Sequence, residues 1–478
     1  MSISTAATAG GLVELTAHPM QRAGAFALAA LARRDHPHEV GEEEFGAAWT
    51  LMTDDAAAAT RRLDAKQPGA FLLAASYGLW PNCKMNIAAI RKLPADKRVE
   101  AVEQWRAPRG PASWPDADCV LCGRAACGFF GKVDVPLAMS VKYRNTTVPG
   151  HPGLALCRGC LASFYALPYA CHFHSGRAAI LHSWDEAFLG PAVRGQVIDT
   201  RRRIASMSTE KPAKTAYARE QLALERLRRY SHPVTADVSL IVFANGNQEQ
   251  EFSEYRISLP LATWLRSTAR QPERKSAWSA LERACHSERF AGPSALAGLL
   301  VHEPHRIAGQ VARYISTRTA DSRGSELADE VTGLVALLQS FVREVQQVNE
   351  QQLQEIVEVG NRAAALMTVT RKKVNTLVVA HRKSRDLRRW LNRCTVDWLL
   401  EHANPALTSI ADTSRPFISP SQLHWLFKYG DEAWLFRNLL FTAVLAELQR
   451  LGHQPDAEDT QEIKDALDED VTDKEDEQ

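Results

Sequence analysis

Two Cys-X-X-Cys pairs carry the strongest chemical signal in this chain. Cys119 and Cys122 form the first pair, Cys157 and Cys160 form the second, and 34 residues lie between the pairs. Zinc prefers thiolate ligands in a closed tetrahedral shell of four, and two short pairs at this spacing supply such a shell. The sequence therefore predicts one structural Zn²⁺ site. The alternatives are two unrelated pairs of buried thiols, or a redox dithiol.

A basic segment between residues 371 and 393 carries the strongest electrostatic signal. It contains nine cations against one acidic residue, Asp386, and on a helix the cations fall mainly outside the apolar positions. Cations that neutralise phosphates release counterions, which produces salt-sensitive and sequence-independent binding. We therefore expect the basic segment to contact nucleic acid rather than to be an ordinary solvated helix face. The nine cations are Arg371, Lys372, Lys373, Arg382, Lys383, Arg385, Arg388, Arg389 and Arg393.

Two polar loops contain residue types that contact bases and phosphates. The first loop covers residues 80–86, and the second lies between the cysteine pairs, where a bound metal ion would hold it firmly. Amides, cations and aromatic rings read base edges or stack on bases, although ordinary surface turns have the same composition. A weaker basic cluster covers residues 201–203. The candidate contacts are Asn82, Lys84 and Asn86 in the first loop and Lys142, Tyr143, Arg144 and Asn145 in the second.

Signals for catalysis are weak. The chain lacks a Walker phosphate loop, an HEXXH motif and a GXSXG motif. His172, His174, His182 and Asp185 follow the second cysteine pair and could indicate a metal-dependent nuclease. No second acidic cluster with ligand spacing accompanies them, so we expect no catalytic residues and a non-enzymatic protein.

Charge is distributed unevenly, although the net charge of the 478 residues is only +1. Residues 456–478 contain 12 of the 56 acidic residues and 2 of the 57 basic ones, which leaves 55 basic and 44 acidic residues in the rest. A basic body with an acidic tail is common in proteins that handle nucleic acid, but a solubilising disordered tail has the same composition.

The composition indicates a cytoplasmic protein. Nine cysteines without a signal peptide are typical of a reducing compartment, where thiols bind metal or stay unpaired. The longest apolar run, residues 23–32, is too short to cross a bilayer, so we expect no membrane partner.

We expect an α+β fold in three parts. Residues 1–286 form a mixed N-terminal domain with an embedded zinc-finger unit at about 115–175 and a β-hairpin. Residues 287–455 form a C-terminal helical bundle, and residues 456–478 form an acidic disordered tail.

Several elements have clear sequence patterns. A helix rich in small residues is expected at 20–34, and a hairpin pairs residues 238–244 with 252–259. Apolar residues spaced alternately by four and three between 327 and 348 predict a seam for helix packing. A break is expected at Gly360, followed by a second long helix from about residue 362 to 402.

The ordered set of motifs resembles the large subunit of type I CRISPR surveillance complexes (Cascade), in the subfamily with two Cys-X-X-Cys pairs that is associated with type I-B systems. The resemblance covers roughly residues 12–440. Trp80 together with Cys83, Lys84 and Met85 departs from it, since Phe and small polar residues are expected there. The landmarks are, in order, Leu15-Thr16-Ala17-His18-Pro19, Gly24, Trp80-Pro81-Asn82, Cys119/Cys122 with Gly123, Pro149-Gly150, Cys157/Cys160, Phe243-Ala244-Asn245 and Leu259-Pro260.

The resemblance implies a non-catalytic role in antiviral defence. Such a subunit contacts the 5′ handle of the CRISPR RNA (crRNA), recognises the protospacer-adjacent motif (PAM) in target double-stranded DNA and promotes strand opening. Its implied partners are the backbone and handle-binding subunits, the small subunits, and a recruited helicase–nuclease or a transposition effector. The two loops would face the handle or the PAM, with Tyr143 as a stacking wedge, and the bundle would track the displaced strand. The alternatives are a stand-alone zinc-containing nucleic-acid-binding regulator and a metal-dependent nuclease.

Overall fold

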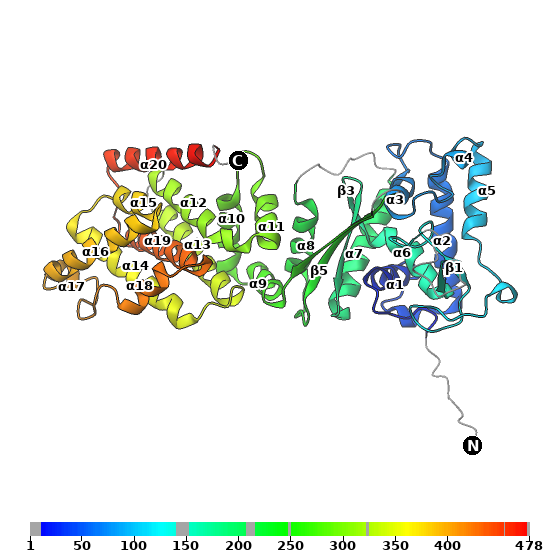
Figure 1. Cartoon of the computed structure of the whole chain (residues 1–478), viewed down its shortest axis with the longest axis horizontal. Coiled ribbons are helices and arrows are strands. Elements are labelled where there is room, and N and C mark those ends of the chain that lie inside the picture. The colour runs from blue at the N-terminus through cyan, green and yellow to red at the C-terminus, as the bar shows by residue number, and fades with distance from the viewer. Residues whose placement is uncertain are drawn as a thin grey trace, which may run out of the picture. The chain divides into compact units, whose positions relative to one another are not determined.

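The computed structural model describes residues 11–139, 153–206, 216–246, 250–321, 325–453 and 455–475. The fold is α+β, as expected, with two small antiparallel sheets among many helices (Figure 1). The chain divides into two compact units, the first made of residues 1–226 and 230–259 and the second of 227–229 and 260–478. The second unit therefore begins near residue 260 rather than 287, because α9 and α10, which the sequence analysis placed in the first domain, belong to the helical unit.

The first part of the chain combines helices with both sheets. A two-stranded sheet pairs β1 with β2, and the four strands of the other sheet lie in the order β3-β4-β5-β6. The elements are α1 (Pro19–Leu31), α2 (Glu42–Thr60), α3 (Phe71–Leu79), α4 (Ala88–Arg91), α5 (Ala95–Arg106), β1 (Gly128–Phe130), β2 (Leu154–Leu156), α6 (Arg158–Ala170), β3 (His172–His174), β4 (Arg177–Ser183), α7 (Glu186–Ala205), α8 (Ala218–Arg229), β5 (Val238–Asn245) and β6 (Gln250–Ile257).

Helix α1 packs closely on α6 at the centre of the first unit. The helix expected at 20–34 is confirmed, and every residue of α1 from Met20 to Ala29 is buried. Gly24 permits the close approach, since an added Cβ would overlap the backbone carbonyl of Ser163 on α6. Gln21 reinforces the contact because its side-chain amide donates to the Ser163 hydroxyl at 3.3 Å.

The predicted hairpin is also confirmed, as β5 and β6. Its strands pair in antiparallel register from Val238 opposite Ile257 to Asn245 opposite Gln250. Asn245 is fully buried, and its side-chain amide donates to the backbone carbonyl of Leu79 at 2.9 Å. The end of this strand therefore supports the loop that follows α3.

The second part of the chain is entirely helical in its described residues. The predicted apolar seam lies along α13, where Val331, Leu334 and Phe341 are at most 1% exposed. The helices are α9 (Leu259–Arg270), α10 (Pro272–Cys285), α11 (Gly292–His302), α12 (Ile307–Asp321), α13 (Ser325–Glu344), α14 (Glu350–Thr370), α15 (Asn375–His381), α16 (Ser384–Glu401), α17 (Pro405–Thr408), α18 (Pro420–Phe427), α19 (Asp431–Arg450) and α20 (Ala457–Glu475).

The expected break at Gly360 is wrong. Gly360 lies inside α14, where the missing side chain allows α19 to approach, because an added Cβ would lie 2.7 Å from the Ala443 Cβ. The break occurs instead at Arg371, which has a positive φ of 53° and ends α14. The basic segment is thus divided between the end of α14, the short helix α15 and helix α16 rather than forming one long helix.

The expectation of a disordered tail is also not met, because residues 457–475 form helix α20 (Figure 1). This helix packs along α12 and α15. Ile463 is 1% exposed and Asp459 is 2% exposed. Despite its acidic composition, the helix therefore has one buried apolar residue and one buried carboxylate that caps another helix. Two carboxylates of this helix, those of Glu458 and Glu462, lie against the Lys373 ammonium of the same unit.

The close packing of α1 on α6 generates the first prediction. The substitution Gly24→Ala should destabilise the first unit by about 2–3 kcal/mol, because the added methyl group meets backbone that cannot move independently. The matched control is Gly46→Ala, at an exposed position inside α2 where nothing lies within 4 Å of the added Cβ. The control should leave the free energy of unfolding unchanged or raise it by about 1 kcal/mol. Denaturant unfolding followed by tryptophan fluorescence measures both, and equal stabilities for the two variants would contradict the packing described.

Candidate metal centre and nucleic-acid interface

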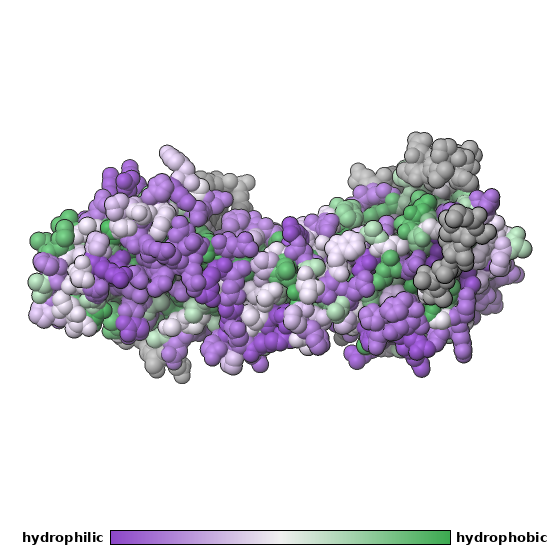
Figure 2. Space-filling view, turned by 90° about the horizontal axis from the view of Figure 1, so that it is seen from below, coloured by the Kyte–Doolittle hydropathy of each residue, from purple (hydrophilic) through white to green (hydrophobic). Residues whose placement is uncertain are grey.

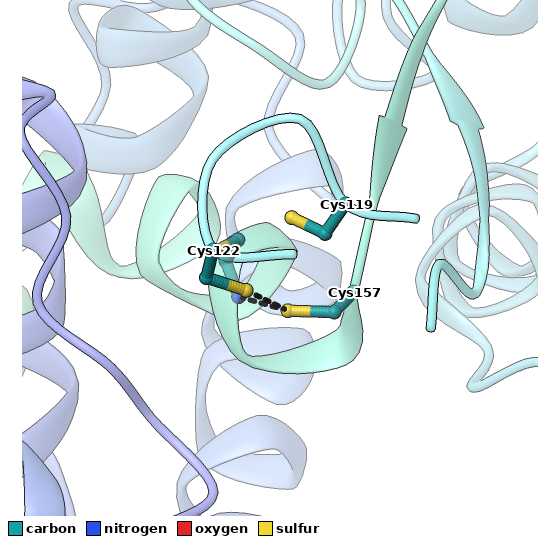
Figure 3. Close-up of side chains that lie close together, drawn as sticks. Cys119, Cys122 and Cys157 are labelled. Carbon is teal, nitrogen blue, oxygen red and sulfur yellow. Dashed lines mark hydrogen bonds between the residues drawn. The ribbon is translucent and has the colours of Figure 1, made fainter. Parts of the chain in front are cut away.

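The four cysteines of the two pairs lie together in the first unit. Their sulfur atoms are all within 4.8 Å of one another, and the Sγ atoms of Cys122 and Cys157 are 3.5 Å apart (Figure 3). Four sulfurs around one tetrahedral zinc are separated by about 3.8 Å, because each Zn–S bond is about 2.3 Å long. The predicted proximity is confirmed, and the set can hold one metal ion with small side-chain adjustments.

Two different backbone devices present these cysteines. In the first pair, the Gly123 N–H donates to the Cys119 carbonyl at 2.8 Å, and Gly123 has a φ of +75° that favours glycine. In the second pair, Cys157 is the N-cap of α6, and its sulfur accepts the Cys160 N–H at 3.4 Å. A turn and a helix start are thereby brought together on one centre.

The small sheet joins the two pairs. Strand β1 follows the first pair, strand β2 precedes the second, and their register runs from Gly128 opposite Leu156 to Phe130 opposite Leu154. The Val120 N–H also donates to the Ala155 carbonyl at 3.0 Å, which ties the first turn to β2 directly. The backbone alone therefore places the two pairs at one site.

The protonation states of Cys119, Cys157 and Cys160 are strongly interdependent. Hydrogen bonds from Cys157 and Cys160 lower the pKa of Cys119, whereas the hydrogen bond with Cys119 raises the pKa of Cys157 to about 12. The pKa of Cys160 is raised by the same neighbours and by burial. Cys119 ionises readily at the expense of Cys157 and Cys160, so a bound cation is needed to hold these three as thiolates together.

The second predicted loop lies outside the described residues. Lys142, Tyr143, Arg144 and Asn145 fall between residues 139 and 153, so the structure does not place them. The flanking segments are described, and they show that this insert connects β1 with β2. The insert that contains this loop therefore connects the same two strands that join the cysteine pairs.

The first predicted loop, residues 80–86, offers two of its three candidates to solvent. Asn82 and Lys84 are exposed, whereas Trp80, Cys83 and Met85 are at most 2% exposed. The side chain of the third candidate points inward. The Asn86 amide donates to the carbonyls of Ser76 and Trp80, each at 3.0 Å, and therefore holds the loop in shape.

A buried cluster beneath this loop was missed by sequence reasoning. The Arg106 guanidinium is 2% exposed and lies 3.4 Å from the ring centroid of Tyr165, with Trp80 and Trp105 within 5 Å. The Asp134 carboxylate accepts hydrogen bonds from the Trp105 indole at 2.7 Å and the Tyr165 hydroxyl at 2.8 Å. These residues are scattered over 86 positions of the sequence, so no local pattern marks them. The cluster joins the loop to α6, the helix that begins at the cysteine centre.

The basic segment exposes some of its cations and pairs others, and the exposed Arg385 and Arg389 lie 3.6 Å and 3.4 Å from the Asp386 carboxylate. Lys372 pairs with Asp397, and the Lys373 ammonium lies 3.0 Å from the Glu458 carboxylate. Arg382 is half-buried. Figure 2 shows one face of the helical unit, on which hydrophilic residues predominate. The exposed cations are Arg371 at the end of α14, Lys383 before α16, and Arg385, Arg388, Arg389 and Arg393 on α16.

The segment also borders a groove of about 560 Å³. A groove with this donor set suits an anion, because ammonium, guanidinium, hydroxyl and amide groups all donate hydrogen bonds to oxygen atoms. Its one acidic member is Asp397, which is already paired with Lys372. The lining residues are Lys372, Lys373, Thr376, Trp390, Asn392, Arg393, Val396 and Asp397.

The residues considered for a nuclease do not form a metal site. Asp185 is the N-cap of α7, where one carboxylate oxygen accepts the Phe188 N–H at 3.1 Å and the other accepts the Thr235 N–H at 2.8 Å. Burial lowers the pKa of His172 to about 4. Among the described residues, the four cysteines are the one group of three or more His, Cys, Asp or Glu side chains close enough to share an ion.

Metal binding by the four cysteines is directly measurable. The purified chain should contain one zinc ion, and Cys157→Ser with Cys160→Ser should reduce the metal content to near zero because two thiolates cannot close the shell. Cys127→Ala is the matched control, since Cys127 is buried nearby but does not belong to the set. Metal analysis by plasma mass spectrometry decides the matter. Equal metal content in the double variant and the control would contradict the assignment.

Among the residues described, no helix has the length and apolar composition needed to cross a membrane. Comparison with known proteins gives no relative from which a role could be transferred. No family model, curated protein or solved structure matches the chain.

Proposed function

We propose that this chain is the non-catalytic large subunit of a type I CRISPR RNA-guided surveillance complex. In this role it contacts the 5′ handle of the crRNA, recognises the PAM in target duplex DNA, promotes strand opening and presents a surface to the recruited effector. The observation that carries the proposal is the cysteine centre at the base of the β1–β2 hairpin, whose loop contains Lys142–Asn145.

A structural zinc ion at this centre would act as a clamp. Zinc bound by four thiolates has no open coordination position, so it fixes backbone rather than activating water. The 131–153 insert begins after β1 and ends before β2, and these paired strands lie beside the cysteine centre. Attachment at both ends limits the conformations available to the loop. A loop restrained at its base loses less entropy when it binds DNA, and this favours recognition of a short motif.

The exposed residues of the first loop complete the proposed recognition surface of this unit. Asn82 offers an amide and Lys84 offers an ammonium group, which read base edges and contact phosphates respectively. Asn86 contributes to recognition only indirectly, because its hydrogen bonds to Ser76 and Trp80 hold the loop in shape. The buried Arg106 cluster supports the same loop from below.

The helical unit supplies a second, sequence-independent surface. The exposed arginines of α16 suit the phosphates of a displaced single strand, because guanidinium groups bind phosphate oxygens in pairs. The rival role as a stand-alone regulator requires tight DNA binding without a guide RNA. The rival role as a nuclease would need metal ligands, and both carboxylate oxygens of Asp185 are already used within the fold.

The loop assignment is tested in the assembled complex. Lys142→Ala with Arg144→Ala should weaken binding to a PAM-containing duplex at least about tenfold, because lost base or phosphate contacts cost on the order of 1–3 kcal/mol. Lys92→Ala with Lys97→Ala is the matched control, since it removes two exposed cations of the same unit. Electrophoretic mobility shifts with PAM and scrambled-PAM duplexes measure the effect. The loop assignment fails if both variants bind the two duplexes as the parent does.

The surface of α16 is tested by salt dependence. Arg388→Glu with Arg389→Glu should reduce the slope of log affinity against log salt by about 1.4, which corresponds to two lost phosphate contacts on a single strand. Lys275→Glu with Arg289→Glu reverses two exposed cations of the same unit outside the basic segment. Fluorescence anisotropy with a labelled oligothymidine gives the slopes. Identical slopes for the two double variants would remove α16 from the nucleic-acid interface.

A further inference from the structure

The acidic helix α20 lies against the basic segment of its own unit. It packs along α12 and α15, with Ile463 at 1% and Ala466 at 7% exposure as its described apolar anchors (Figure 1). The Asp459 carboxylate accepts the backbone N–H groups of Val374 and Asn375, each at 2.7 Å. The start of α15 is therefore capped by the C-terminal helix rather than by a residue of its own segment.

Two further carboxylates of α20 engage a cation that lines the groove. The Lys373 ammonium lies 3.0 Å from the Glu458 carboxylate and 3.2 Å from the Glu462 carboxylate. The Asn375 side-chain amide donates to the second oxygen of Glu462 at 3.0 Å. These carboxylates bring the pKa of Lys373 above its ordinary value, since they stabilise the charged ammonium. The carboxylates thus satisfy the donors that a phosphate of a bound strand would use.

Carboxylate and phosphate oxygens compete for the same ammonium and amide donors. The ion pairs of Lys373 are partly exposed and are therefore individually weak, and the described apolar anchorage of α20 is small. A polyanion with many phosphates can displace such a contact, whereas a single anion cannot match its local concentration. The contact of Lys373 with Glu458 and Glu462 therefore forms in the unbound chain but can be replaced by a bound polyanion.

We propose that α20 is a built-in competitor of nucleic acid. It covers Lys373 and the adjacent edge of the groove with carboxylates, and the phosphodiester backbone of a single strand displaces these carboxylates when it binds. This inference rests on the proposed nucleic-acid contact of the basic segment and adds an autoinhibitory contact to it. Strands that bind weakly or non-specifically do not displace the carboxylates from Lys373. Strands that are also held by other contacts displace them and bind at this edge of the groove.

The test uses the full chain and a fluorescein-labelled oligothymidine in anisotropy titrations at several salt concentrations. Glu458→Gln with Glu462→Gln keeps the shape of α20 but removes both carboxylates from Lys373. Release of one cation should add about 0.7 to the magnitude of the salt slope and tighten binding about 5- to 10-fold near about 50 mM salt. Adding Lys373→Gln to this variant should return the slope to the parent value, because the released cation is gone.

The control is Asp465→Asn, compared with Glu462→Gln alone. Asp465 is exposed on the same helix and accepts a hydrogen bond from Gln461, so its removal changes the net charge equally without touching Lys373. Glu462→Gln should tighten binding more than Asp465→Asn. Equal effects of these two variants, or an unchanged slope in the Glu458/Glu462 variant, would overturn the competition. Absence of strand binding by the parent and all variants would instead refute the proposed nucleic-acid contact itself.

Discussion

The first unit depends on the placement of helix α6. Its N-terminus carries two of the four clustered cysteines, so the start of the helix forms half of the cysteine cluster. Further along α6, the backbone of Ser163 lies close to Gly24 of α1. The ring of Tyr165, also on α6, packs against the Arg106 guanidinium. The Tyr169 hydroxyl donates to Asp55 of α2 at 2.8 Å. A single helix thus connects the cysteine centre with α1, with α2 and with the loop at 80–86.

The same helix links the cysteine cluster with the loop at 80–86 through Tyr165. The hairpin β1–β2 fixes the base of the 131–153 insert, and the Arg106 cluster supports the loop at 80–86 from beneath. Asn245 adds a contact from the four-stranded sheet to the carbonyl of Leu79. The cysteine cluster and the loop at 80–86 are thus connected by one network of buried contacts, and pre-organisation of this kind would reduce the entropy that the loop loses on binding.

Sequence reasoning succeeded where a local pattern determines the structure. Cysteine spacing predicted the cluster, an apolar run followed by a turn predicted the β5–β6 hairpin, and a stretch rich in small residues predicted helix α1. The identity of the metal stays a prediction, and so do the roles of the loops in binding. Gly360 was misread because a glycine at a helix crossing and a glycine at a helix end look the same in sequence.

Other features require the tertiary structure. The inward direction of Asn86 depends on the carbonyls of Ser76 and Trp80, which no local pattern places. Helix α20 contacts the Lys373 ammonium and the Val374 backbone, 80 to 90 residues away in the sequence, so a composition that is typical of disorder folds against its own unit. The Arg106 cluster likewise brings together residues from four segments.

The proposed role is tested most directly by the RNA that accompanies the protein. The chain should be expressed from its own locus with the neighbouring gene products, purified by a tag on this subunit, and analysed by sequencing of the bound small RNA. The account predicts a multi-subunit complex that contains RNAs with one constant 5′ handle followed by variable guide sequences. Purification of the chain alone, without such RNA and with tight binding to DNA, would contradict the account and identify a stand-alone DNA-binding protein.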